Sequence, residues 1–82
     1  MSNEEIKKIK LNCLTDFQRA AILYTQNGSW SIFFNHGQTL LQKLNSNKLL
    51  EECNHIQQMI DQKEKIEYVS DRLLTVGLMA SC

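Results

Sequence analysis

The stretch from Asn47 to Ala80 limits the possible folds more than any other part of the chain. It contains no proline, and its only glycine is Gly77. On both sides of a polar waist, Asp61–Lys65, apolar residues recur at steps of three and four, the spacing that keeps one face of a helix apolar. The two stripes comprise Leu49, Cys53, Ile56 and Ile60, and then Ile66, Val69, Leu73 and Val76. The stretch is therefore predicted to be helical, with its apolar face buried.

The waist leaves two arrangements open. Met59, Ile66 and Leu73 follow one another at intervals of seven, so the two stripes can join in phase along one continuous helix. At ~1.5 Å per residue this helix would span about 50 Å, too long for a compact monomer with a radius of gyration of ~12 Å. Either the chain folds back at the waist as a helical hairpin, or the helix continues and packs against a second chain.

A first helix is predicted from about residue 3 to residue 26. Ser2 and Glu5 form a capping box, in which the serine caps an early amide and the glutamate reaches back. Asn27–Gly28 ends the helix, because either residue can adopt the left-handed conformation found at helix C-termini. The apolar face of this helix comprises Ile6, Ile9, Cys13, Phe17, Ala20 and Tyr24.

A second helix is predicted near residues 30–45, and it is the most hydrophobic part of the chain. Trp30, Phe33 and Phe34 would each bury on the order of 150–250 Å² if they lay inside. Gly37 in mid-helix costs roughly 1 kcal/mol relative to alanine, so we expect another backbone to approach closely there. The residues Asn45, Ser46 and Asn47 then form a turn, and Asn47 is the expected N-cap of the next helix.

These patterns predict one all-α domain, residues 1–82, built as an antiparallel bundle of three or four helices. Short turns place successive helices side by side and antiparallel. The expected boundaries are near 3–26, 30–45, 47–62 and 64–80, with the last two forming one long helix or a hairpin. A domain of this size has little interior of its own, so we also expect a dimer.

Charge and cysteine content narrow the class of protein. Nine basic residues balance nine acidic ones, and this neutral balance disfavours nucleic acid as a partner. No uninterrupted apolar run is long enough to span a membrane. Three cysteines with no close pair, Cys13, Cys53 and Cys82, argue against a disulfide framework and favour a reducing cytoplasm.

Metal-site patterns are weak. Glu52 and His55 have the Glu-x-x-His spacing of di-iron bundles, but those proteins need the motif twice together with two further glutamates. A zinc site from Cys13, His36, Cys53 and His55 lacks the close ligand pairs that such sites usually have. We therefore expect no metal and no cofactor, with His36 at the edge of the core.

No catalytic constellation stands out either. Nucleophilic catalysis requires a nucleophile, a base and an orienting group brought together, and no glycine-rich turn presents such a group here. All three glycines are isolated, so there is no phosphate-binding loop. The chain is therefore not expected to be an enzyme.

The leading functional hypothesis is a small cytoplasmic adaptor, chaperone or regulator that binds a partner helix, or its own copy, through an apolar helical face. The expected anchors are Trp30, Phe34, Leu41, Ile66, Leu73 and Val76. A dimeric nucleic-acid-binding regulator that uses Lys7, Lys8 and Lys10 is one alternative. A metal or redox protein that uses Glu52, His55 and the cysteines is the other.

Overall fold

The computed structural model describes residues 1–82, which form four α-helices and no strand. The helices are α1, Asn3–Thr25; α2, Trp30–Lys43; α3, Asn47–Asp61; and α4, Ile66–Ala80. The prediction of an all-α chain is confirmed, and every predicted boundary lies within two residues of the observed one. None of the four helices is both long and apolar enough to cross a membrane.

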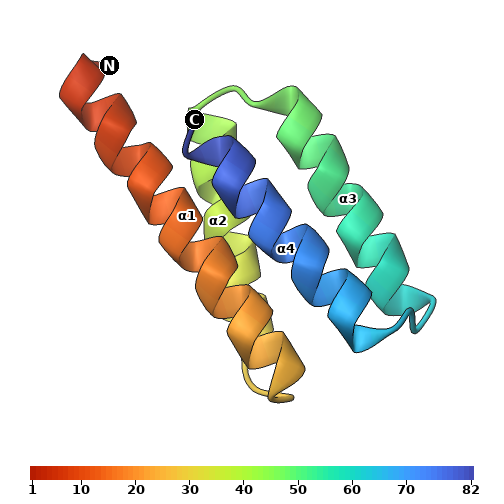
Figure 1. The fold of residues 1–82 in the computed structure, drawn as a ribbon. Coiled ribbons are helices and arrows are strands. Elements are labelled where there is room, and N and C mark those ends of the chain that lie inside the picture. The colour runs from red at the N-terminus through yellow and green to blue at the C-terminus, as the bar shows by residue number, and fades with distance from the viewer.

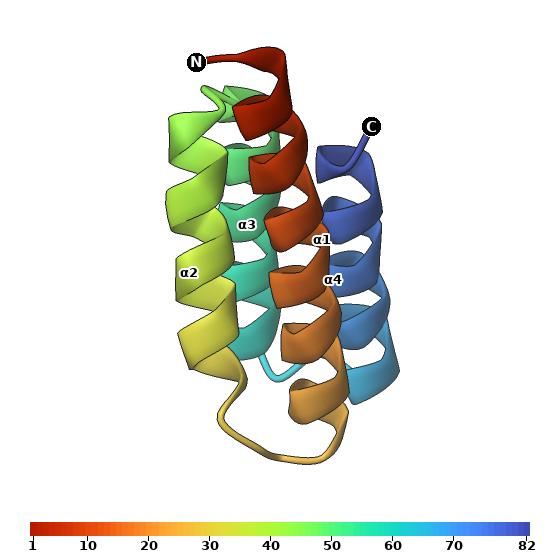
Figure 2. The same ribbon diagram turned by 90° about the vertical axis from the view of Figure 1, so that its left-hand side faces the viewer.

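The four helices form a compact bundle (Figures 1 and 2). The α1–α2 and α3–α4 turns lie at one end, and the α2–α3 turn lies with both chain termini at the other. The radius of gyration is 12.1 Å and the longest extent is 40 Å. Because residues 62–65 interrupt the helix, the C-terminal half is a hairpin, and the alternative of one continuous helix is wrong.

One hydrogen-bond pattern ends α1, α2 and α3. After α1, the Gly28 amide donates to the Leu23 carbonyl at 2.7 Å, and the Asn27 amide donates to the Tyr24 carbonyl at 3.2 Å. Asn27 has a φ of 56°, and this combination is the Schellman motif. The same pattern recurs around Asn45, with a φ of 55°, and around Lys63, with a φ of 57°. Three left-handed residues therefore make the three turns of the bundle.

The helix N-termini are capped unequally. The Glu5 amide donates to Ser2 Oγ at 3.2 Å, so the serine half of the predicted capping box is present. The N-cap residue of α3 is Ser46, and the Ser46 side chain makes no capping hydrogen bond. Asn47, predicted as the cap, is instead the first helical residue.

The core is organised around α1 rather than around the C-terminal half. α1 packs most extensively, against both α2 and α4, whereas α3 packs less against each of those helices. The buried apolar residues form one cluster that draws on all four helices: Cys13, Phe17, Ala20, Ala21, Phe34, Leu40, Leu41, Cys53, Ile56, Val69, Leu73, Val76 and Ala80. The sequence stripes on α1, α3 and α4 therefore face one common interior.

Phe17 lies at the centre of this packing, between two glycines. A Cβ atom added to Gly37 of α2 would lie 2.8 Å from Phe17 Cε2. A Cβ atom added to Gly77 of α4 would lie 2.9 Å from Phe17 Cβ. Both distances are shorter than van der Waals contact, so a side chain at either position would require Phe17 to move. The close approach expected at Gly37 is thus made by an aromatic side chain and not by a backbone.

Candidate partner-binding surface

Most of the predicted partner anchors belong to the core of the single chain. Four of the six are no more than 2% exposed: Phe34, Leu41, Leu73 and Val76. These four side chains hold the helices together and cannot touch a partner while the bundle is closed, so their assignment as surface anchors is corrected. Trp30 is half-buried and packs against Tyr24 and Phe34. Ile66 is 51% exposed and is the one predicted anchor that projects into solvent.

A different apolar surface follows the line of contact between α1 and α4. Figure 1 shows these two helices side by side, and three contacts fix their register. Lys10 Nζ donates to the Cys82 carbonyl at 2.8 Å, and Ser70 Oγ donates to the Ala21 carbonyl at 3.4 Å. Between these contacts, Gly77 lies against Phe17. Residue numbers therefore fall along α1 as they rise along α4, which places Leu78 level with Leu14.

Position on the helix decides which side chains on α1 face outward. Successive side chains turn by about 100° around a helix, so a residue at the α1–α4 contact can have a buried neighbour before it and an exposed one after it. On α1, Ala20 is buried, Ala21 faces α4 and Ile22 is 54% exposed.

The same order holds on α4. Val76 is buried, Gly77 touches α1, and Leu78 is 56% exposed. Leu74, one turn before Leu78, is 37% exposed. Since both helices turn their buried residues toward the same core, both turn their exposed residues toward the same outer side.

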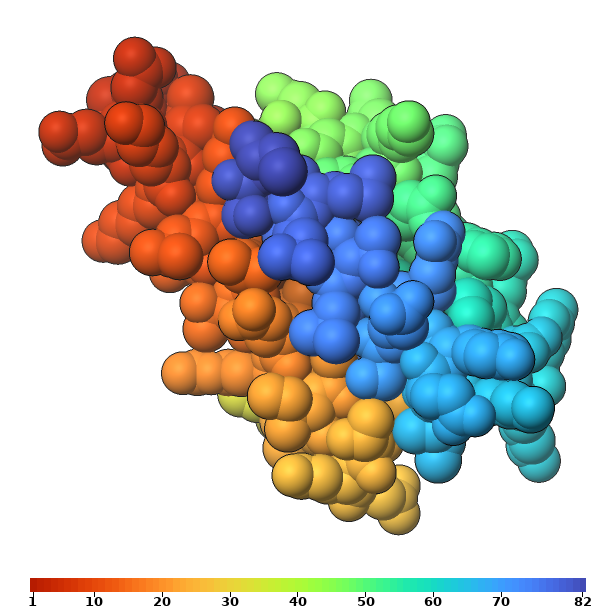
Figure 3. Space-filling view, viewed as in Figure 1, coloured from red at the N-terminus to blue at the C-terminus, as the bar shows by residue number.

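Helix position places four leucines on that outer side: Leu11, Leu14, Leu74 and Leu78. We call this surface the leucine face. Leu11 is 60% exposed, and Leu14 is half-buried beside Gly77. Figure 3 shows α1 and α4 side by side on the face turned toward the viewer. Polar side chains, including Gln18 and Asp71, border the leucines. An apolar centre with a polar border is typical of a protein-binding surface.

A buried carboxylate links α1 to α2. Asp16 Oδ2 lies 2.5 Å from His36 Nδ1, and the Asp16 side chain is 10% exposed while that of His36 is 61% exposed. A carboxylate in this position orients an imidazole, as in catalytic dyads. Neither Asp16 nor His36 lines one of the two surface pockets. The pair satisfies a buried charge and fixes α2 on α1.

The two buried thiols, Cys13 and Cys53, both have raised pKa values. Burial, with the Asp16 charge nearby, raises the pKa of Cys13 to about 11, and its Sγ points to the Gly37 carbonyl at 3.8 Å. Burial, followed by the effects of Cys13 and Glu52, raises the pKa of Cys53 to about 12. Thiols held protonated in this way are weak nucleophiles and weak metal ligands at neutral pH. Cys82 is the exposed thiol.

Glu52 and His55 of the Glu-x-x-His motif do not form a joint site. Glu52 Oε2 accepts a hydrogen bond from Arg72 of α4 at 2.6 Å, which makes it part of an ion pair. His55 is exposed. No three side chains of histidine, cysteine, aspartate or glutamate gather closely enough to hold a metal ion. Of the N-terminal lysines, Lys7 and Lys8 are exposed.

Comparisons of the chain with protein-family models, curated proteins and solved structures gave no match.

Proposed function

We propose that this protein is a small cytoplasmic interaction module that binds an amphipathic helix across the leucine face. The observation that supports the proposal is the position of Leu11, Leu74 and Leu78, which are exposed and do not belong to the buried core cluster. A helix that packed along the line of contact between α1 and α4 would cover these side chains. Recognition of this kind uses apolar residues spaced three and four apart on the bound helix.

Two kinds of partner fit this surface, another protein or a second copy of this chain. α1 itself carries exposed apolar side chains at Leu11 and Ile22. The α1 helix of a second copy could therefore be the helix that binds. The adaptor, chaperone and regulator roles would all operate through this contact. These three roles differ in which protein the bound helix belongs to.

Site-specific photocrosslinking tests the proposal. A benzophenone amino acid placed at Leu78 should yield a discrete crosslinked product in cells, because Leu78 lies at the centre of the leucine face. The same residue placed at Ile32 of α2, which is 65% exposed and outside the leucine face, is the matched control. A product of twice the chain mass would identify a second copy as the partner. Equal crosslinking at both positions, or at neither, would contradict the proposal.

A further inference from the structure

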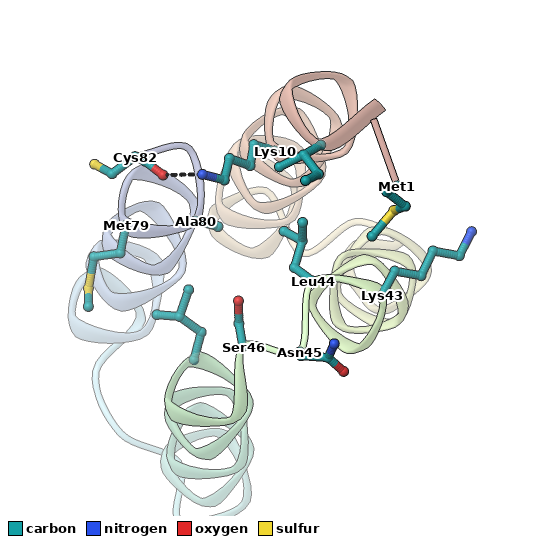
Figure 4. Close-up of a pocket in the computed structure, with 11 residues that line it drawn as sticks. Met1, Lys10, Lys43, Leu44, Asn45, Ser46, Met79, Ala80 and Cys82 are labelled. Atoms are coloured by element: carbon teal, nitrogen blue, oxygen red, sulfur yellow. Dashed lines mark hydrogen bonds between the residues drawn. The ribbon is translucent and has the colours of Figure 1, made fainter. Parts of the chain in front are cut away.

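A pocket of about 460 Å³ opens at the end of the bundle where both termini lie (Figure 4). The start of α1, the α2–α3 turn and the end of α4 surround it. Its volume falls within the range of ~300–1,000 Å³ that small-molecule sites occupy. The pocket is separate from the leucine face, so the inference drawn from it is independent of the proposed function.

The walls of the pocket are mainly apolar. Ile6, Leu44 and Leu49 contribute side chains that are only half-buried, and Met79 is 43% exposed. Covering this remaining apolar area would be favourable, because it removes apolar surface from water. A ligand with a hydrocarbon part would therefore gain affinity that a purely polar one would not.

Two polar groups are available to a ligand. Lys10 Nζ donates to the Cys82 carbonyl at 2.8 Å, and an ammonium has two further donors. The Ser46 side chain, which makes no capping hydrogen bond, points into the space between Leu44 and Ala80 in Figure 4. Lys43 also borders the pocket, but its ammonium group points away from it.

The local charge favours an anion. No aspartate or glutamate lines the pocket, and neither ion pair of the chain involves a lysine. Two helices begin at this end and two finish there, so their opposite terminal dipole charges offset each other. The positive charges at the pocket are the ammonium of Lys10, which already donates to the Cys82 main-chain oxygen, and the amino group of Met1.

We propose that this pocket binds a small amphipathic carboxylate, such as a medium-chain fatty acid. The carboxylate group accepts hydrogen bonds from Lys10 Nζ and Ser46 Oγ. The hydrocarbon tail covers Ile6, Leu44 and Leu49.

Titration of ¹⁵N-labelled protein with octanoate, followed by amide NMR shifts, tests this assignment. Saturable shifts are expected at Leu44, Ser46 and Leu49, and neither 1-octanol nor acetate should reproduce them at the same concentration. Equal shifts from octanol would overturn the role of the anion, and equal shifts from acetate would overturn that of the tail. Shifts confined to other regions, or none at all, would overturn the site.

Substitution of the charged group provides the second arm. Lys10→Gln should weaken octanoate binding roughly tenfold, because a charge-assisted hydrogen bond is lost, whereas Lys10→Arg should retain most of the affinity. Lys43→Gln is the matched control, since Lys43 borders the same pocket but points away, and a change below about twofold is expected. Equal weakening by Lys10→Gln and Lys43→Gln would overturn the assignment of Lys10, as would unchanged binding in Lys10→Gln.

Discussion

At the scale of single residues, the contact of Phe17 with two glycines determines how closely α1, α2 and α4 can pack. A glycine inside an exposed helix costs ~1 kcal/mol relative to alanine, so replacing it normally stabilises a protein. Here a methyl group at Gly37 would strike the Phe17 ring, and one at Gly77 would strike Phe17 Cβ. The ring can tilt by a small amount, but Cβ moves only if the α1 backbone moves.

Gly77→Ala should therefore lower the free energy of unfolding by about 1–3 kcal/mol, the usual effect of overpacking a core. Gly37→Ala should lower it by less. Gly28→Ala is the control, because its Cβ would meet the flexible end of Leu23 at an exposed turn and φ there is not positive. Urea unfolding of the three variants measures the effect. A Gly77→Ala protein more stable than the wild type would show that α4 does not pack on Phe17 in this way.

The buried thiols predict a loss of stability in alkali. The pKa of Cys13 rises from 9.0 to about 11 and that of Cys53 from 9.0 to about 12 on folding. Above pH 9 the unfolded chain releases these protons while the folded chain keeps them, so unfolding becomes more favourable as pH rises. The free energy of unfolding should fall by up to ~1.4 kcal/mol per pH unit for each thiol.

Urea unfolding between pH 8 and about pH 10.5 measures how steeply the free energy of unfolding falls with pH. The difference in this slope between the wild type and a cysteine variant is the contribution of that thiol. Cys53→Ala should be less stable at pH 8, since it leaves a cavity, but its stability should fall less steeply with pH. Other groups titrate in the same range, and they contribute equally to both proteins. Parallel slopes for the wild type and Cys53→Ala would mean that the Cys53 thiol is not held protonated.

The link between Asp16 and His36 shows what single-residue patterns leave out. Asp16 falls between Cys13 and Phe17 on the buried side of α1, and a carboxylate in an apolar stripe is a signal that a partner is needed. The identity of that partner depends on how α2 sits on α1. Periodicity within each helix carries no information about this register.

At the scale of helices, local sequence accounts for most of the fold. Steps of three and four placed all four helices, and Asn27 and Asn45 ended two of them because asparagine tolerates the left-handed conformation. The third turn could not be predicted from an asparagine, because the residue with the left-handed conformation there is Lys63. The waist contains no glycine, proline or asparagine. Burial of both apolar stripes, on α3 and α4, offsets the strain at Lys63 and bends the chain there.

Lys63→Gly should accordingly stabilise the protein by up to ~1 kcal/mol, since glycine adopts a positive φ without steric strain. Lys63→Val should destabilise it, because a β-branched side chain is disfavoured in that conformation. Lys65→Gly is the control, since Lys65 has a φ of −55° and gains nothing from glycine. Thermal unfolding of the three variants gives the comparison. If Lys63→Gly were no more stable than Lys65→Gly, the turn would not be formed as described.

At the scale of the whole molecule, the candidate site was harder to predict than the fold. The sequence identified apolar stripes, but whether a stripe is core or surface depends on which helix lies at the centre. The apolar stripes do not show that α1 is the helix that packs most extensively. Leu73 and Val76 therefore lie inside, while Leu74 and Leu78, on the neighbouring side of the same helix, are exposed. Dimerisation stays a prediction.

The leucine face should contribute to binding and little to folding, and quantitative affinity capture from cells tests this most directly. Tagged wild-type protein, Leu78→Gln and Ile32→Gln would be compared, since glutamine preserves helix propensity and both positions are more than half exposed. We expect a partner, or untagged copies of the chain, at near-equal amounts with the wild type and Ile32→Gln, and a loss of at least about tenfold with Leu78→Gln at unchanged thermal stability. Undiminished capture by Leu78→Gln would contradict the account.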